Sequence, residues 1–354
     1  MAMRQGNSVL IGCTMKKNRF QFSTGVTDCY FNASFVQLSK LTDPGSTVVV
    51  TDQQVYRYHR TLFAKWNTIV LRCGEKYKVQ ATVDALIEQL ISLKADRSTT
   101  LVGVGGGVVT DLVGYTAAVY MRGIRFGFVP TTLLAMVDAS IGGKNGVDVG
   151  VYKNLVGTIR QPSFLLYDAS LLSTLPKNEW QNGFAEIIKH AAILDASLFA
   201  ALEKRELQYY QKNTKALRTL IARNARLKIK VVQQDEHEKG NRKLLNFGHT
   251  LGHALENQYE LSHGQAISLG MMAAAQLSAH YLGFTEVMRM EKLLLRYGLP
   301  TQAQYNKKKA LAVLRMDKKK QAEQIGYVLL NKIGRASVHT LSFAQLEKQI
   351  IKLP

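Results

Sequence analysis

Apolar positions in the first half of the chain follow two different periodicities. Short runs rich in β-branched and apolar residues, typical of buried strands, occupy residues 47–51, 68–71, 99–104 and 123–130. Between these runs, the apolar positions of residues 81–93 recur at helical spacing, and a helix is expected from Gly107 to about Met121. Strands that alternate with helices predict a mostly parallel sheet.

The second half of the chain has a different pattern. From about Leu171 onward the apolar spacing is helical over long stretches, namely residues 180–194, 214–232, 251–258 and 265–281. A strand pattern returns only at residues 325–330, and there is no internal repeat. The change in pattern falls near residues 160–175. We therefore predict an α/β domain over residues 1–170 and an all-α domain over residues 171–354.

Composition agrees with a protein of two ordinary domains. The chain has 354 residues, of which 46% are hydrophobic and 20% charged, the balance of a soluble globular protein. No run of about 18 uncharged apolar residues occurs, and the start of the chain lacks the apolar stretch of a signal peptide. We expect a cytoplasmic protein without a membrane partner. Cys13, Cys29 and Cys73 are odd in number and form no CxxC pair, so free thiols are expected.

The formal net charge of +20 raises the question of a nucleic-acid partner. The lysines and arginines are spread along the chain, with only short clusters at residues 307–309 and 318–320, and no nucleic-acid-binding motif accompanies them. A basic, solvated surface is the simpler interpretation, so no nucleic-acid partner is expected. A field of this sign also steers anionic substrates toward a cleft.

A glycine-rich turn follows the third predicted strand. Residues 103–107 read Gly-Val-Gly-Gly-Gly, and Val108 stands where a complete GxGxxG motif would have its third glycine. Glycines at a strand end let a phosphate approach the backbone, and the helix N-terminus behind them favours negative charge. Alone the pattern is weak, because a tight structural turn explains it nearly as well, and Asp111 could serve only as a complement to the helix dipole.

Polar residues concentrate between Thr131 and Asn154. Thr131 and Thr132 follow a predicted strand and offer hydroxyl groups to a cofactor, a Gly-Gly-Lys sequence ends at Lys144, and Lys153 with Asn154 adds a further pair of donors. For any one of these residues a polar loop is the simpler explanation. Their concentration within about 25 residues favours a site, because function collects on loops carried by a scaffold.

The most specific pattern is a set of histidines in the second half. His249 and His253 stand four residues apart, on one face of a helix, and His263 follows ten residues later. Upstream, Glu186 and Lys189 are one turn apart on an otherwise apolar helix. Three histidines and a carboxylate can hold a divalent metal with an open position for a substrate. Spacing alone predicts that both His249 and His253 are metal ligands.

A charged segment, residues 235–240, lies between the predicted helices. We interpret most of it as a solvated turn. Lys228 and Arg242 flank it and can reach the cleft.

Taken together, these segments resemble the 3-dehydroquinate synthase family, in that family's order and at its spacing. They are GGGV at residues 105–108 with Asp111, PTTLLAMVDASIGGK at 130–144, AEIIK at 185–189, LNFGHTLGHALE at 245–256, and HG at 263–264. The resemblance covers roughly residues 45–335.

The resemblance implies a dehydroquinate synthase-like fold, in which a Rossmann-like, NAD-binding α/β domain precedes a helical metal-binding domain and the active site lies between them. It also implies the conversion of 3-deoxy-D-arabino-heptulosonate 7-phosphate to 3-dehydroquinate and phosphate, in the shikimate pathway of aromatic amino acid biosynthesis. In that family NAD oxidises a hydroxyl, phosphate is eliminated, the hydride returns, and an intramolecular aldol step closes the ring. The cofactors expected are NAD and a divalent metal, zinc or cobalt.

The resemblance also assigns roles to the matching residues. The metal ligands would be Glu186, His249 and His263, which moves His253 from the metal to the substrate phosphate. The catalytic residues would be Asp138, Lys144, Lys189, Asn246 and His253. The substrate-binding residues would be Asn154, Lys228, Arg242 and one lysine of the pair Lys318 and Lys319. Arg122 would reach the phosphate from a partner subunit, which makes the protein a homodimer. NAD would be lined by Asp52, Glu75, Lys78, Gly106, Gly107, Val108, Asp111, Thr131, Thr132, Lys153, Thr174, Leu175 and Glu179.

Two departures and three alternatives remain. Gln54, in the early cofactor segment, stands where the family commonly has the smaller Asn. Gln265 stands where the family usually has Glu, which changes how the neighbouring His263 would be tuned rather than the class of reaction. Other sugar phosphate cyclases share the NAD and metal apparatus, but Lys228 and Arg242 favour a carboxylated substrate. Related metal-dependent alcohol dehydrogenases release NADH, and the basic phosphate site argues against them. A nucleic-acid-binding protein is supported by the net charge alone.

Overall fold

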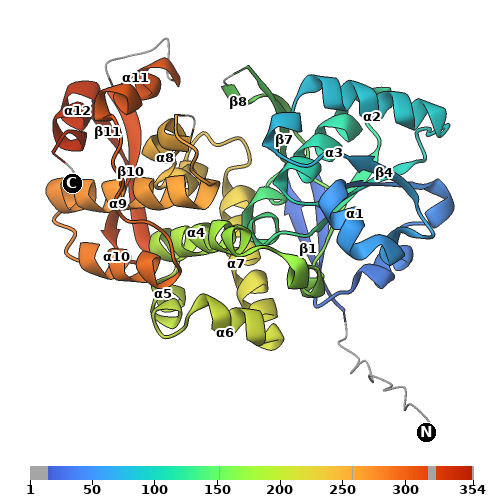
Figure 1. Cartoon of the computed structure of the whole chain (residues 1–354), viewed down its shortest axis with the longest axis horizontal. Coiled ribbons are helices and arrows are strands. Elements are labelled where there is room, and N and C mark those ends of the chain that lie inside the picture. Colours follow the sequence, from blue (N-terminus) through green and yellow to red (C-terminus); the bar gives the residue numbers. More distant parts are fainter. Residues whose placement is uncertain (1–14, 151, 257, 318–323, 353–354) are drawn as a thin grey trace, which may run out of the picture.

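A seven-stranded sheet organises the first half of the molecule (Figure 1). The computed structural model describes residues 15–150, 152–256, 258–317 and 324–352. The strand order is β1-β2-β9-β6-β5-β3-β4, and every pair is parallel except β1 with β2. The strands are β1 (Lys16–Phe22), β2 (Gly25–Phe31), β3 (Thr47–Asp52), β4 (Asn67–Leu71), β5 (Thr100–Gly105), β6 (Arg125–Pro130) and β9 (Phe164–Leu166).

The four predicted strands are confirmed as β3 to β6. Strands β3, β5 and β6 contain mostly buried residues, since both faces of a parallel sheet are covered by helices, whereas β4, at the edge of the sheet, buries only Ile69 and Leu71. The predicted helices are confirmed as α2 (Gln80–Ser92) and α3 (Gly107–Val119), and α1 (Gln53–His59) follows β3. The carboxyl ends of β3, β5 and β6 meet at one edge of the sheet, which is where ligands bind in such folds.

Several strands escaped the sequence pattern. Strands β1 and β8 (Tyr152–Ile159) carry mostly polar or exposed side chains, so they lack the apolar run that marked β3 to β6. Strand β8 pairs with β7 (Lys144–Val149) in a hairpin, so part of the stretch from Thr131 to Asn154, where the candidate site is predicted on loops, is strand.

Helices dominate the second half. They are α4 (Lys177–Leu194), α5 (Ala196–Glu203), α6 (Leu207–Lys212), α7 (Thr214–Gln234), α8 (His249–Glu256), α9 (His263–Leu282), α10 (Val287–Arg296), α11 (Lys307–Asp317) and α12 (Phe343–Ile350). The predicted helices correspond to α4, α7, α8 and α9. The strand predicted at 325–330 belongs to β10 (Gln324–Lys332), which pairs with the unpredicted β11 (Arg335–Ser342). This half is therefore helical with one two-stranded sheet, rather than all-α.

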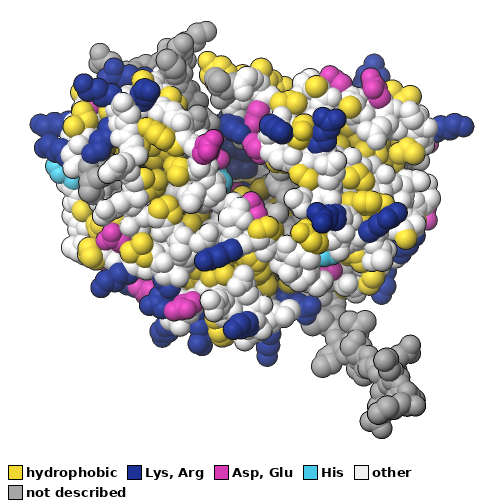
Figure 2. Space-filling view, in the orientation of Figure 1, with side chains coloured by type: hydrophobic (Ala, Val, Ile, Leu, Met, Phe, Trp, Pro, Cys, Tyr) yellow, Lys and Arg dark blue, Asp and Glu magenta, His cyan; other side chains and the backbone are white. Residues whose placement is uncertain are grey.

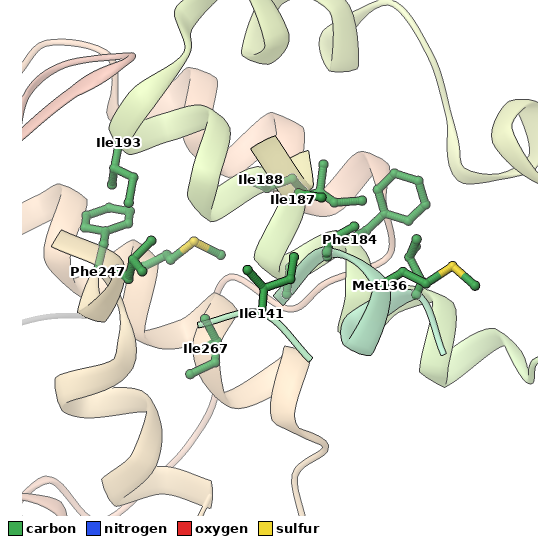
Figure 3. Packing of buried hydrophobic residues seen from close by; sticks show 14 of the residues in the cluster. Met136, Ile141, Phe184, Ile187, Ile188, Ile193, Phe247 and Ile267 are labelled. Carbon is green, nitrogen blue, oxygen red and sulfur yellow. The ribbon is translucent and has the colours of Figure 1, made fainter. Parts of the chain in front are cut away.

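The buried core runs from one half into the other through α4. Figure 3 shows Met136 and Ile141, from the segment after β6, near Phe184 and Ile188 of α4. Phe247 belongs to the same cluster from the opposite side. Because α4 is buried along most of its length, its polar residues are held in fixed positions.

We propose residue 170 as the boundary between the halves, since β9 ends at Leu166 and α4 begins at Lys177. Cys29 is buried and Cys73 partly exposed, and both are free, whereas Cys13 lies outside the described residues. In the described part of the chain, no helix combines the length and apolarity needed to cross a membrane.

Candidate functional site

A cavity of about 910 Å³ lies between the carboxyl edge of the sheet and the helical half. Its wall combines residues of the β5–α3 turn with residues of α4, α7, α8 and the start of α9. Figure 2 shows the hollow between the two halves, with charged side chains around its mouth. Every residue predicted to contact NAD lines this cavity, as do all five predicted catalytic residues.

The glycine turn forms one end of the cavity. Strand β5 ends at Gly105, and Gly106 caps the N-terminus of α3. A Cβ atom on Gly105 would lie 2.5 Å from Cγ2 of Val109, and one on Gly106 would lie 3.0 Å from Cγ2 of Thr132. The turn therefore requires glycine, and it leaves backbone N–H groups at a helix N-terminus facing the cavity, the arrangement that binds a pyrophosphate.

Polar side chains beside the turn also fit a dinucleotide. The buried Oγ1 of Thr131 has no hydrogen-bond partner among the described residues. Asp52 Oδ1 accepts hydrogen bonds from the N–H groups of Gln54 and Val55 and so caps α1. Lys78 forms an ion pair with Asp111. Burial raises the pKa of Asp111 to about 6, although the positive charge of Lys78 acts to lower it. All four of these residues line the cavity, so they offer a dinucleotide both charged and neutral polar groups beside the turn.

A group of metal-ligand side chains lies at the other end of the cavity. The ligand atoms of Glu186, His249 and His263 all lie within 4.8 Å of one another. Nε2 of His263 is 3.2 Å and Nε2 of His249 is 3.5 Å from the same Oε1 of Glu186. Two imidazoles and a carboxylate that converge on one point, with the histidines facing a cavity, suit a divalent ion with an open position. The three residues therefore fit a zinc or cobalt ion.

Charge is concentrated around this group. Burial alone would raise the pKa of Glu186, but Lys189 and the histidines lower it overall. Burial lowers the pKa of His249 well below its ordinary value, and Lys189 adds to this effect. His263 has its pKa raised to about 10, because hydrogen bonds to Glu186 and Glu256 outweigh its burial. A metal ion would take the place of the proton that lies between the His263 imidazole and the Glu186 carboxylate.

Buried cations surround Asp138. Nζ of Lys228 is 2.8 Å from Oδ1 of Asp138 and also donates to its backbone carbonyl, while Nζ of Lys189 is 4.0 Å from Oδ1 and contacts Glu186. The buried His190 lies 3.3 Å from the same oxygen. Although burial raises the pKa of Asp138, the two lysines lower it well below its usual range, so the carboxylate is ionised.

The residues predicted to bind a carboxylate lie on the same wall. Arg242 is only 3% exposed, and its Nη1 and Nη2 donate to the backbone carbonyls of Glu236 and Gly142. Lys228, a residue of α7, is 7% exposed. Burial lowers the pKa of both side chains.

The interpretation of most of residues 235–240 as a solvated turn is confirmed, but Glu236 and Glu238 depart from it. Glu236 is 5% exposed, and Asp235 accepts hydrogen bonds from the N–H groups of Lys239, Gly240 and Arg242. Glu238 lines the cavity, where it contacts Lys144 and accepts a 2.6 Å hydrogen bond from Asn246. A charged loop gives no periodic signal, so the sequence pattern could not separate this segment from a surface turn.

The sequence pattern also did not single out Glu256 as a residue of the site. Its Oε2 lies 3.6 Å from Nδ1 of His263, on the side away from Glu186. A carboxylate in this position orients a metal-binding imidazole. Gln265 accepts a hydrogen bond from the N–H of Ser262 in a capping box at the start of α9, a task that does not need the charge of a glutamate.

The remaining predicted residues fall into three cases. His253 lines the cavity, with its ring 5.0 Å from that of His249, but does not belong to the group of ligand atoms. Arg122 follows α3 and does not line the cavity of its own chain. Lys318 and Lys319 lie outside the described residues. The roles assigned to these four residues, like those of the other site residues, stay predictions.

Solved structures of sugar phosphate cyclases are similar over nearly the whole chain. A 2-deoxy-scyllo-inosose synthase, complexed with carbaglucose-6-phosphate, NAD+ and Co2+, is 26% identical with a TM-score of 0.83, over 95% of this chain and 99% of that one. The 2-epi-5-epi-valiolone synthase of Streptomyces hygroscopicus subsp. jinggangensis, with NAD+ and Zn2+ bound, is 27% identical with a TM-score of 0.81, over 92% and 96% of the two chains.

Sequence relatives point to one branch of these enzymes. The family models for the N-terminal and C-terminal parts of 3-dehydroquinate synthase match residues 68–182 and 183–320. The 3-dehydroquinate synthase of Nitrosospira multiformis is 41% identical over 277 residues, which are 77% of this chain and 76% of that protein. The chain therefore belongs to the 3-dehydroquinate synthase family.

Proposed function

We propose that this protein is a 3-dehydroquinate synthase, a phosphorus–oxygen lyase that uses NAD and a divalent metal ion. Its substrate would be 3-deoxy-D-arabino-heptulosonate 7-phosphate and its products 3-dehydroquinate and phosphate. The observation that carries the proposal is one cavity that joins the Glu186, His249 and His263 group to buried cations and to a glycine turn. The family and the cofactors in its solved neighbours support it.

When bound, NAD would supply a hydride acceptor, and a divalent metal ion would supply a Lewis acid for the hydroxyl that is oxidised. Glu186, His249 and His263 would hold the ion. Lys189 and the ionised Asp138 lie between this group and Lys228, so they can orient substrate hydroxyls there. Because these side chains are buried and mutually paired, the substrate meets groups whose positions are already fixed.

Lys228 and Arg242 would bind the substrate carboxylate. A guanidinium has five N–H donors, and backbone carbonyls occupy at least two of those of Arg242, which leaves others for a ligand. A planar fork with fixed direction suits a carboxylate better than a hydroxyl. This pair favours a carboxylated sugar phosphate over the uncarboxylated substrates of other cyclases.

The phosphate would be held by Lys144, Asn154, His253 and one of the lysines at 318 and 319. Lys144 contacts Glu238, and Asn154 accepts a hydrogen bond from Lys78. Both of these phosphate-binding side chains therefore already make a polar contact in the absence of phosphate. Arg122 would complete the site from a partner subunit in a homodimer. The assigned pathway and the free thiols support a cytoplasmic location.

Phosphate release tests the proposal. Purified protein with zinc or cobalt, a trace of NAD and the heptulosonate phosphate should release phosphate over many turnovers, while absorbance of NADH stays near baseline. Net NADH formation would instead identify an alcohol dehydrogenase. Turnover of an uncarboxylated sugar phosphate, without turnover of the heptulosonate, would identify another cyclase.

A further inference from the structure

The buried carboxylate of Glu236 ties the loop after α7 to the opposite half of the molecule. Its Oε2 accepts hydrogen bonds from the hydroxyl of Ser23 and, at 3.1 Å, from the N–H of Thr24, both in the turn between β1 and β2. Its Oε1 accepts from the Thr24 hydroxyl and, at 2.7 Å, from Nε2 of Gln161. Four donors on one carboxylate, from two segments of the first half, make a strong and directional tether.

The same residue also holds Arg242. The backbone carbonyl of Glu236 accepts from Nη1 of Arg242, and the carbonyl of Gly142 accepts from Nη2 at 3.0 Å. A Cβ atom on Gly142 would lie 2.7 Å from Nη2, so the guanidinium packs directly on this turn. The direction of the guanidinium therefore depends on where the loop of Glu236 is held relative to the first half.

The tether closes this arrangement into a ring of contacts. Gln161 donates to Glu236 and packs against Gly143, where a Cβ atom would lie 2.8 Å from its Nε2. The Gly142–Gly143 turn thus lies between the two side chains, Arg242 and Gln161, that the loop of Glu236 engages. Loss of the carboxylate would free the loop at one end while leaving the side chain of Arg242 present.

We propose that Glu236 is a positioning residue for substrate binding, which acts by fixing the direction of the Arg242 guanidinium through the β1–β2 turn. The inference rests on the proposed role of Arg242 as the residue that binds the substrate carboxylate. A carboxylate contact is made in the ground state and in the transition state alike, so its loss raises KM more than it lowers kcat.

The charge state of Glu236 is consistent with this role. Burial raises the pKa of its carboxyl group, but the hydrogen bonds from Ser23, Thr24 and Gln161 lower it to about 2 overall. The group is therefore an acceptor for all four donors at neutral pH. An amide in its place keeps the shape but turns one acceptor oxygen into an NH2 group, which then faces the N–H of either Thr24 or Gln161, neither of which can accept a hydrogen bond.

The test is a double-mutant cycle between Glu236→Gln and Arg242→Lys. Steady-state kinetics on the heptulosonate phosphate, at saturating metal and NAD, gives kcat and KM, and thermal unfolding is recorded for each variant. Glu236→Gln should raise KM about tenfold and change kcat by less than about twofold. In the Arg242→Lys background, the same substitution should raise KM by less than about twofold. Glu203→Gln, which breaks an exposed pair with Arg289, is the matched control and should leave KM unchanged.

A milder variant guards against a general loss of stability. Thr24→Val removes one hydroxyl from the tether but keeps its N–H, and should raise KM in the same direction by a smaller factor, again only while Arg242 is intact. An unchanged KM in Glu236→Gln, or effects that multiply in full with those of Arg242→Lys, would overturn the inference and leave the role of Arg242 standing. An unchanged KM in Arg242→Lys alone would overturn both.

Discussion

The two ends of the cavity recognise ligands by opposite means. At the β5–α3 turn the wall includes the backbone of Gly106 and Gly107, and its contacts depend on the absence of side chains there. At the opposite end the wall consists of buried ionised groups, of which Glu186 and Lys189 are almost fully enclosed. The size of the introduced side chain should therefore decide the effect of a substitution at the β5–α3 turn, whereas its charge should decide the effect at the opposite end.

The largest effect is expected at the metal group. Glu186→Gln, His249→Ala or His263→Ala should each remove the metal ion and abolish turnover, because each deletes or neutralises one of three ligands. Metal content by atomic emission and phosphate release measure the two consequences. His280→Ala, which alters an exposed histidine paired with Gln349, is the control and should keep both. Full metal occupancy in all three variants would rule out the assignment.

Arg242 tests the charged end through the substrate. Arg242→Ala should lower kcat/KM by roughly 10²-fold, since a buried hydrogen-bonded charge pair is worth a few kcal/mol. Arg242→Lys should recover part of the loss, because the charge remains and the fork is lost. Binding of metal and NAD should change little. If Arg242→Ala were as active as the parent, the carboxylate would be bound elsewhere.

Gly106 tests the backbone end. In Gly106→Val the added atoms would meet the side chain of Thr132 and fill the space in front of the helix N-terminus, so NAD affinity should fall by about tenfold or more. Metal content should not change. Gly326→Ala in β10 is the control, since its nearest neighbour would be at an ordinary 3.6 Å. Equal NAD affinity in Gly106→Val, measured by calorimetry, would show that the dinucleotide does not use this turn.

The same contrast explains what the sequence could predict. The parallel strands β3 to β6 have short, dense apolar runs, so they were found, and the helical spacing of α4, α7 and α9 reflects their buried faces. Polar and exposed strands such as β1 and β8 have no such signal. Among site residues, glycines and histidines stand out by type. Glu236 and Glu238 do not, because a buried carboxylate differs from a surface one only through partners distant in the chain, such as Thr24 and Lys144.

The smallest effect concerns stability at the charged end. Glu236 has an ordinary carboxyl pKa of 4.5 when unfolded and a pKa lowered to about 2 when folded, so the folded state binds its proton less readily. Its ionised form therefore stabilises the fold fully above about pH 4.5, and this contribution is lost as the pH falls toward 2. Glu236→Gln should be less stable than the parent by about 1–3 kcal/mol near neutral pH, with a gap that narrows on acidification. Urea unfolding from about pH 6 down to about pH 3 measures the gap. A gap that stayed constant over this range would mean that Glu236 contributes through its shape alone, and the tether to Ser23 and Thr24 would not depend on charge.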